Sequence, residues 1–326
     1  MEGAKFADRH GFKAIWTPER HFYRFGGLYP NPSVLGAALA VATERIQIRA
    51  GSVVLPLHHP VRVAEEWAVV DNLSRGRVGL AFASGFVPTD FVFAPDNFAT
   101  RRDVMFEGID TVKQLWRGES VRVLDGNGAP TEVAIYPKPV QPELPVWLVT
   151  ARNEDTFVEA GKIGANVLTS LILLSVEEVA QRIALYRETL AKNGHDPEQG
   201  QVTLMLHTFL GDDIDKVRET VREPFYDYLR SHLEMIKTVA ANQNINMDEE
   251  SLPVGDREAL LSFAFERYFN TTSLCGTPSS CRSMIERLSA IGVNEIACLI
   301  DFGVDVDSTM MSLQHLSALK EQVAQG

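Results

Sequence analysis

The sequence predicts an α/β fold, a (β/α)8 (TIM) barrel, and three observations lead to it. Short apolar runs alternate with amphipathic helices along nearly the whole chain, as in proteins with a parallel sheet. Several of these runs are β-branched or continuously apolar, as strands covered on both faces are. The length of 326 residues suits one closed barrel. We therefore expect a single barrel domain over residues 1–326.

Seven strands are predicted from the apolar runs. In chain order they are Lys13–Trp16, Ile46–Leu55, Val78–Ala83, Val146–Val149, Ala165–Thr169, Val202–Leu210 and Glu295–Ile300. Seven is one fewer than a complete barrel needs. Because the chain opens in what looks like the first helix, Gly3–His10, we expect the first strand of the barrel to be the absent one.

Clear start signals mark two of the helices between the strands. Ser175 and Glu178 have the spacing of a capping box, ahead of an apolar helical repeat. Thr277 and Pro278 suit the N-cap and first positions of a later helix. Two stretches, 86–100 and 242–256, break the alternation because they are polar or rich in Pro, Asp and Asn, and we expect insertion loops there.

Composition excludes several classes of function. The formal net charge of −12 repels phosphate backbones, and no Lys/Arg cluster offsets it, so nucleic-acid binding is not expected. No apolar run reaches membrane-spanning length, and the N-terminus lacks the order of a signal peptide. We expect a cytoplasmic protein that does not associate with membranes.

The three cysteines predict neither disulfides nor a metal site. Cys275, Cys281 and Cys298 lack the paired spacing of zinc ligands, and no His-x-x-x-His accompanies them. Cys281 and Cys298 lie in apolar segments, where a free cysteine behaves as a small hydrophobe. Such usage suits a reducing cytoplasm, and no metal is expected.

The first candidate site follows the first predicted strand. Active sites of α/β barrels lie at the carboxyl ends of the strands, and Glu19, Arg20 and His21 place a carboxylate, a cation and a titratable ring at one such end. The functional interpretation is a catalytic group. The structural alternative is a Glu–Arg ion pair beside a hydrogen-bonded histidine.

Two further strand ends carry polar residues. His58 and His59 precede Pro60 at a helix N-terminus, where the positive end of the helix dipole is expected to lower the pKa of an imidazole and favour its neutral form. A packing role and a catalytic role are both open. Thr150–Asn153 opens another helix, whose free backbone N–H groups suit a phosphate. Arg152 would add charge there and Thr156 a hydroxyl group.

One long stretch carries a family resemblance. Residues 56–80, PLHHPVRVAEEWAVVDNLSRGRVGL, resemble the signature of the bacterial luciferase-like flavin-dependent monooxygenases. Other matching segments follow in the family's order, at Trp16–Phe22, Asn31-Pro32, Gly51–Pro56 and Cys275–Pro278. The resemblance covers essentially the whole chain and implies a luciferase-like barrel.

A narrower likeness is to the subgroup that accompanies nonribosomal-peptide and polyketide assembly lines. Tyr23–Ser33, Ser84–Phe86 and Ile300–Gly303 carry it. It implies oxygenation of an amino-acyl, peptidyl or polyketide intermediate in natural-product biosynthesis, as a small molecule or tethered to a carrier protein. Many members have Trp where this chain has Phe86, so Phe86 is expected, with His58, to line the substrate pocket.

The resemblance also implies cofactor and partners. Reduced FMN, supplied by a separate flavin reductase, would react with O2, while the protein excludes water and orients the reactants. Relatives often dimerise through barrel helices, so a homodimer is expected.

Site residues follow from the resemblance position by position. The luciferase α subunit has Glu-His-His where this chain has Glu19-Arg20-His21, and its catalytic histidine stands at the place of Arg20. Arg cannot exchange a proton at neutral pH, so the resemblance leaves His21 for that role. Matches to flavin-contacting positions are Gly51 and Ser52, at the site of a non-proline cis peptide, Ala83 and Ser84 beside the ring, and Thr150, Ala151, Arg152, Asn153 and Thr156 around the phosphate.

Two alternatives to this function stay open. A deazaflavin-dependent hydride-transfer enzyme would use the same barrel without O2. A non-catalytic subunit would bind flavin or act as a scaffold, like the luciferase β chain. Binding tests with FMN and the deazaflavin, and oxygen consumption with reduced FMN, separate the three.

Overall fold

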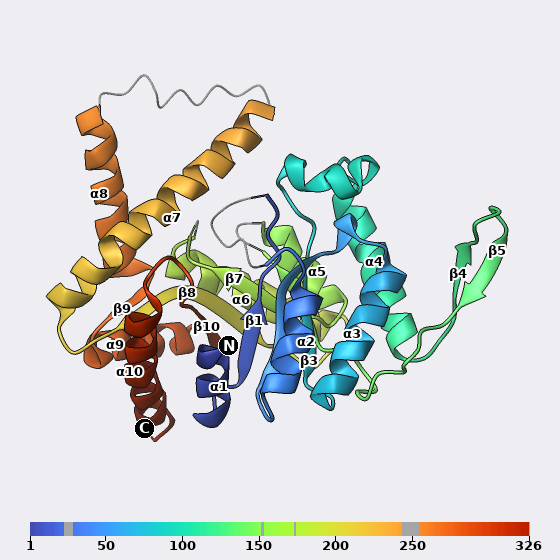
Figure 1. Cartoon of the computed structure of the whole chain (residues 1–326), viewed down its shortest axis with the longest axis horizontal. Coiled ribbons are helices and arrows are strands. Elements are labelled where there is room, and N and C mark those ends of the chain that lie inside the picture. The colour runs from blue at the N-terminus through green and yellow to red at the C-terminus, as the bar shows by residue number, and fades with distance from the viewer. Residues whose placement is uncertain (23–28, 151–152, 173, 243–253, 326) are drawn as a thin grey trace. The chain divides into compact units, whose positions relative to one another are not determined.

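The computed structural model describes residues 1–22, 29–150, 153–172, 174–242 and 254–325 (Figure 1). The chain divides into two compact units, Met1–Val149 and Thr150–Gly326. Each unit contains parallel strands alternating with helices, as the sequence predicts.

Unit 1 is built on four parallel strands in the order β1-β2-β3-β6. Helices α2 and α3 pack side by side next to these strands (Figure 1). A two-stranded antiparallel hairpin, β4–β5, projects from the unit. Its elements are α1 (Glu2–Arg9), β1 (Ala14–Thr17), α2 (Pro32–Ala42), β2 (Gln47–Val54), the 3-10 turn η1 (Leu55–Leu57), α3 (Pro60–Ser74), β3 (Val78–Ala83), the 3-10 turns η2 (Pro88–Phe93) and η3 (Pro95–Asn97), α4 (Arg101–Trp116), β4 (Val121–Leu124), β5 (Pro130–Val133) and β6 (Val146–Val149).

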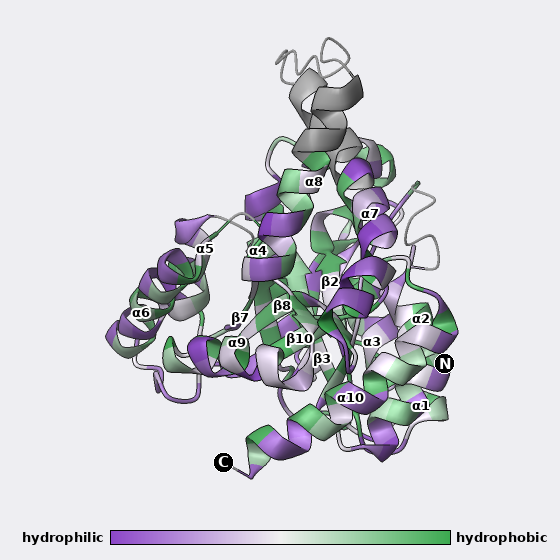
Figure 2. Ribbon diagram, turned by 90° about the vertical axis from the view of Figure 1, so that its left-hand side faces the viewer, coloured by the Kyte–Doolittle hydropathy of each residue, from purple (hydrophilic) through white to green (hydrophobic). Residues whose placement is uncertain are grey.

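In unit 2 the long strand β8 lies between β7 and β10, parallel to both. The short strand β9 pairs with the last three residues of β8. In Figure 2, β8 is coloured hydrophobic whereas α6 carries hydrophilic stripes, as expected for a covered strand and a surface helix. The elements are α5 (Glu154–Lys162), β7 (Asn166–Ser170), α6 (Val176–Lys192), β8 (Val202–Leu210), α7 (Ile214–Asn242), α8 (Val254–Thr271), β9 (Leu274–Gly276), α9 (Pro278–Ala290), β10 (Glu295–Leu299) and α10 (Val306–Ala324).

All seven predicted strands are confirmed, each within one residue at either end. The predicted capping box at Ser175 and the predicted N-cap at Thr277 are also confirmed, and Thr277 forms a capping box with Ser280. The predictions missed β9, which has only three residues, and the β4–β5 hairpin, whose alternating residues are largely exposed. In the described part of the chain no strand precedes α1.

The two predicted loops have different outcomes. Residues 86–100 contain only the 3-10 turns η2 and η3, so a loop without α-helix or strand is confirmed there. For residues 254–256 the prediction is wrong, because α8 begins at Val254. Gly255 and Asp256 are poor helix formers, so no signal in the sequence indicated that a helix begins here. Residues 243–253 lie outside the described chain.

In the family signature, residues 56–80, Asp71 and Arg77 form hydrogen bonds at the amino ends of the strands in unit 1. The Asp71 carboxylate is 0% exposed and accepts hydrogen bonds from the backbone N–H of Val140 and Gln141, at 2.7 and 3.0 Å, and from the Gln141 side chain. Arg77 donates to the carbonyl oxygens of Ala40, in the last turn of α2, and of Thr43 and Ile46, which follow this helix. Residues at this face of a barrel serve stability.

The core of unit 1 contains a buried cation. The Arg49 guanidinium lies over the rings of Trp16 and Trp147, at 5.0 and 4.3 Å from their centroids, and its Nε donates to Gln47 Oε1 at 3.0 Å. Gly79 makes room for this stack, since a Cβ atom there would lie 2.9 Å from the Trp147 ring. Cation–π contact of this kind offsets part of the cost of burying the charge.

No described helix is both long enough and apolar enough to cross a membrane.

Candidate active site

The carboxyl ends of β1 and β2 meet at the side chain of Glu19. This side chain follows β1 and is 0% exposed. Its Oε1 lies 2.9 Å from His21 Nε2 and 2.6 Å from His58 Nε2, while Oε2 accepts the backbone N–H of Val54 at 2.7 Å. Two segments far apart in sequence, 19–21 and 54–58, therefore meet at one carboxylate.

The Glu19 carboxylate and the His58 imidazole of this cluster stabilise each other's charged forms. Burial acts to raise the pKa of Glu19, but the hydrogen bonds from His21, His58 and Val54 outweigh it, so this pKa lies below its ordinary value. Burial acts to lower the pKa of His58, but the hydrogen bond and the charge of Glu19, with a contribution from Glu66, raise this pKa above its ordinary value. Glu19 is thus held as a carboxylate, and His58 is favoured as an imidazolium. The neutral imidazole expected for His58 from its place at a helix N-terminus is therefore wrong, because Glu19 and Glu66 outweigh that effect.

His21 connects the carboxylate to an aromatic rim. Its ring is buried and meets the Phe93 ring edge-on, with centroids 5.0 Å apart. Phe22 lies beside both rings and stacks on Phe93 at 5.8 Å. Phe22 and Phe93 are 63% and 57% exposed, so an apolar surface borders the cluster.

The sequence analysis missed Asp90, a further carboxyl group near this cluster. Burial, the largest influence, raises the pKa of Asp90 to about 6; the charge of His21 acts against this and that of Glu19 adds to it. Within the described chain the Asp90 Oδ1 atom is buried without a hydrogen-bond partner. The only signal available was an acidic residue in the loop after the third predicted strand.

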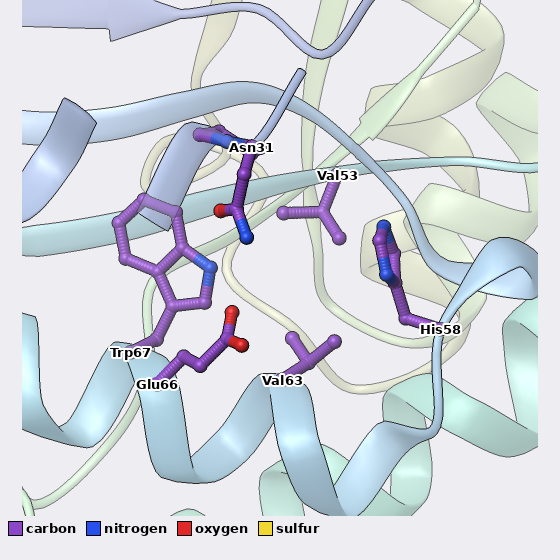
Figure 3. Close-up of a pocket in the computed structure, with 7 residues that line it drawn as sticks. Asn31, Val53, His58, Val63, Glu66 and Trp67 are labelled. Atoms are coloured by element: carbon purple, nitrogen blue, oxygen red, sulfur yellow. The ribbon is translucent and has the colours of Figure 1, made fainter. Parts of the chain in front are cut away.

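A small cavity opens on the other side of His58. It is lined by residues of β2, the start of α2 and the first turns of α3, and Figure 3 shows His58, Glu66 and Asn31 around it. Glu66 accepts a hydrogen bond from Ser33 at 2.7 Å and pairs with Arg62 at 2.9 Å. The lining residues are Asn31, Pro32, Val53, His58, Val63, Glu66 and Trp67.

The predicted flavin contacts of unit 1 lie at the same strand ends. The peptide bond between Gly51 and Ser52 is cis, as the resemblance implied. Ala83 ends β3, Ser84 follows it, and these four small residues are only half-buried. Such small side chains leave the space that a flat ring system needs, so they fit a flavin. Their role in binding it stays a prediction.

The other predicted residues of unit 1 are placed as follows. Arg20 is half-buried and its backbone N–H donates to the Tyr29 carbonyl at 2.8 Å. Within the described chain, Glu19 is bonded to two histidines and a backbone amide, whereas the alternative interpretation expected a Glu–Arg ion pair. Phe86 is 55% exposed beyond the end of β3.

The predicted phosphate turn belongs to unit 2. Buried Thr150 donates from its hydroxyl to the Asn153 carbonyl at 3.1 Å, and Asn153 caps α5 by accepting the Asp155 N–H at 2.9 Å. Thr156 is buried in the first turn of α5. The helix start is therefore built as predicted, whereas Ala151 and Arg152 lie outside the described residues.

No group of three or more potential metal ligands occurs among the residues that the structure describes. The described chemistry at the strand ends is thus that of a carboxylate, two imidazoles and a carboxyl group of raised pKa. Parallel α/β strands with titratable groups at their carboxyl ends define an enzyme of the barrel class.

Comparison with known proteins identifies the family. Residues 1–295 match the family model described as luciferase-like monooxygenase, and the chain belongs to this family. It is 27% identical over 326 residues to the oxygenase component of flavin-dependent trigonelline monooxygenase from Acinetobacter baylyi, covering 97% of this chain and 86% of the relative. It is 26% identical to an alkanal monooxygenase alpha chain of Photorhabdus laumondii, covering 95% and 87%.

Solved structures confirm the predicted fold class. The oxygenating constituent of 3,6-diketocamphane monooxygenase from Pseudomonas putida, a type II Baeyer-Villiger monooxygenase in complex with FMN, superimposes with a TM-score of 0.74 at 18% identity. The match covers 97% of this chain and 90% of that one. The chain therefore has the luciferase-like TIM-barrel fold, in agreement with its membership of the luciferase-like monooxygenase family.

Proposed function

We propose that the protein is the oxygenase component of a two-component system, which uses reduced FMN and O2 to oxygenate a natural-product biosynthetic intermediate. The substrate class is an amino-acyl, peptidyl or polyketide group, as a small molecule or on a carrier protein. The observation that carries the proposal is the buried Glu19 carboxylate with His21 at the strand ends of a luciferase-like barrel.

Two relatives support the cofactor and the partner. The trigonelline monooxygenase relative is named as an oxygenase component, which favours a separate flavin reductase here as well. The diketocamphane monooxygenase is in complex with FMN. When bound, reduced FMN supplies the electrons that activate O2. The protein's three free cysteines suit a reducing cytoplasm, where we place the reaction.

The residues of the strand ends have distinct roles in this proposal. His21 exchanges a proton with the reacting groups, and Glu19 orients its ring through the hydrogen bond at Nε2. Arg20 adds a fixed positive charge at the same strand end. Gly51, Ser52, Ala83 and Ser84 contact the flavin ring.

The substrate surface is apolar. Phe86 and His58 line the pocket, and the exposed side chains of Phe22, Val92 and Phe93 extend it. Contiguous exposed apolar side chains on a protein surface mark binding sites. They would bind the hydrocarbon or aromatic part of an acyl or peptidyl chain and exclude water from the reacting atoms.

The first experiment follows oxygen consumption by the purified protein with reduced FMN, and binding of FMN and of the deazaflavin. FMN binding with oxygen consumption supports the proposal. Tight deazaflavin binding without oxygen consumption would show the hydride-transfer alternative, and flavin binding without any turnover would show the non-catalytic subunit.

Arg152 provides the test of the phosphate site. We expect Arg152→Ala to weaken FMN binding by about tenfold, because it removes one charge-assisted contact to the phosphate. Fluorescence titration of FMN measures it, with exposed Arg267→Ala as the matched control. Unchanged affinity in Arg152→Ala would refute this assignment.

The predicted homodimer has a candidate surface on unit 1. Val34 and Val41 of α2 and Val69 and Leu73 of α3 are 42–68% exposed and stand at helical spacing. The two helices are joined by the hydrogen bond from Ser33 to Glu66. We propose that a second copy of the chain covers this apolar face.

A charge on this face should prevent dimerisation. We expect Val41→Glu to convert the dimer to monomer in analytical ultracentrifugation, since the carboxylate would be buried without a partner. Val306→Glu, at another exposed valine, should leave the mass unchanged. A Val41→Glu variant that is still dimeric would exclude this surface.

A further inference from the structure

His58 shares one oxygen atom of Glu19 with His21. Both imidazoles donate from Nε2 to Oε1, at 2.6 and 2.9 Å. His58 reaches this atom from the turn between β2 and α3, 39 positions along the chain from Glu19. Because both rings contact the same atom, a charge on one must affect the other.

The cluster is more stable with one positive charge than with two. Glu19 has a single negative charge and is 0% exposed, so one imidazolium makes the buried group neutral. A second imidazolium would leave a net positive charge in a site of low polarity, which is costly. The two histidines therefore compete for one proton.

His58 is the better placed of the two to hold this proton. Its side chain is 30% exposed, against 6% for His21. It also faces the cavity with Glu66 (Figure 3), whose charge favours an imidazolium. Other charged groups near these rings are Arg20, between Glu19 and His21 in the sequence, Arg62, which pairs with Glu66, and Asp90, whose pKa the charges of Glu19 and His21 influence.

We propose that His58 is a charge-balancing residue, whose imidazolium neutralises Glu19 and so keeps His21 neutral and able to accept a proton. His21 then has its hydrogen on Nε2, bonded to Glu19, and its Nδ1 is the free acceptor. The inference rests on the proposed function, because only turnover requires a base at His21. It makes His58 a positioning residue that acts through Glu19.

The inference is tested without cofactor by nitrogen NMR of the histidine rings. In the wild type at pH 7 we expect His58 to be doubly protonated and His21 to be protonated at Nε2 alone. In His58→Asn, His21 should take up its second proton at a pH higher by about one unit, because Glu19 is no longer neutralised. A doubly protonated His21 in the wild type, or an unchanged His21 titration in His58→Asn, would overturn it.

Two further variants separate charge balance from a structural effect. In the Glu19→Gln background, adding His58→Asn should not change the His21 titration further, since the coupling passes through Glu19. In His58→Ala, imidazole added to the solution should enter the enlarged cavity and restore the wild-type His21 signals. A change in the first case, or no recovery in the second, argues against the proposal.

Turnover gives the matching kinetic result. The pH dependence of oxygen consumption with reduced FMN should lose activity on its acidic side at a higher pH in His58→Asn, by about one unit. His10→Asn, the same change at an exposed position just after α1, should follow the wild-type profile. Failure of the wild type to consume oxygen would count against the proposed function, whereas the NMR titrations would still decide the role of His58.

Discussion

Replacing Glu19 by Gln is expected to lower the turnover number for substrate oxygenation by about 100- to 10,000-fold, the range for loss of positioned acid–base catalysis. The amide has no negative charge, and its NH2 group would face an imidazole N–H that also donates. His21 would then lose the acceptor at Nε2 that orients its ring.

Product formation from an acyl or peptidyl substrate, with reduced FMN supplied chemically, measures this effect. The Gln carbonyl can still accept the Val54 N–H, so the variant should fold and bind FMN as the wild type does. Exposed Glu107→Gln is the matched control in the same unit. Turnover within about threefold of wild type in Glu19→Gln would show that this carboxylate has no catalytic part, against the usual size of such effects.

The position of this site could be predicted from the sequence, but its connections could not. Apolar periodicity located the strands, and the barrel rule then pointed to Glu19 and His21 at a strand end. The contact between Glu19 and His58 depends on the register of β1 against β2, which pairs Thr17 with Ala50. Periodicity does not encode register between strands, so the role of His58 stayed open.

Asp90 could not be predicted from the sequence for a related reason. It lies in a 3-10 turn of six residues, inside a loop where no helical or strand period exists. Its raised pKa comes mainly from burial; the charge of Glu19 adds to this effect and that of His21 opposes it. Propensity and spacing contain no information about such burial.

The signature that identified the family also proves to be mainly structural. The stretch 56–80 begins at the site with His58, but its D-x-L-S-x-G-R part lies at the amino ends of the strands. There Arg75 and Gly76 have φ of 60° and 82°, which end α3 and turn the chain into β3. A motif can therefore report the fold while most of its residues are remote from the chemistry.

Stability should depend strongly on Asp71, the first residue of that part of the motif. We expect Asp71→Ala to lower the free energy of unfolding by about 3 kcal/mol, since two backbone amides and the Gln141 side chain would lose their shared acceptor. The segment that leads into β6 would no longer be fixed to the end of α3. Urea unfolding followed by circular dichroism measures the change, and exposed Asp110→Ala on α4 is the matched control. If both variants unfold at the same urea concentration, Asp71 does not hold this end of the sheet, and the stability of the unit must come from Arg77 and the packed core instead.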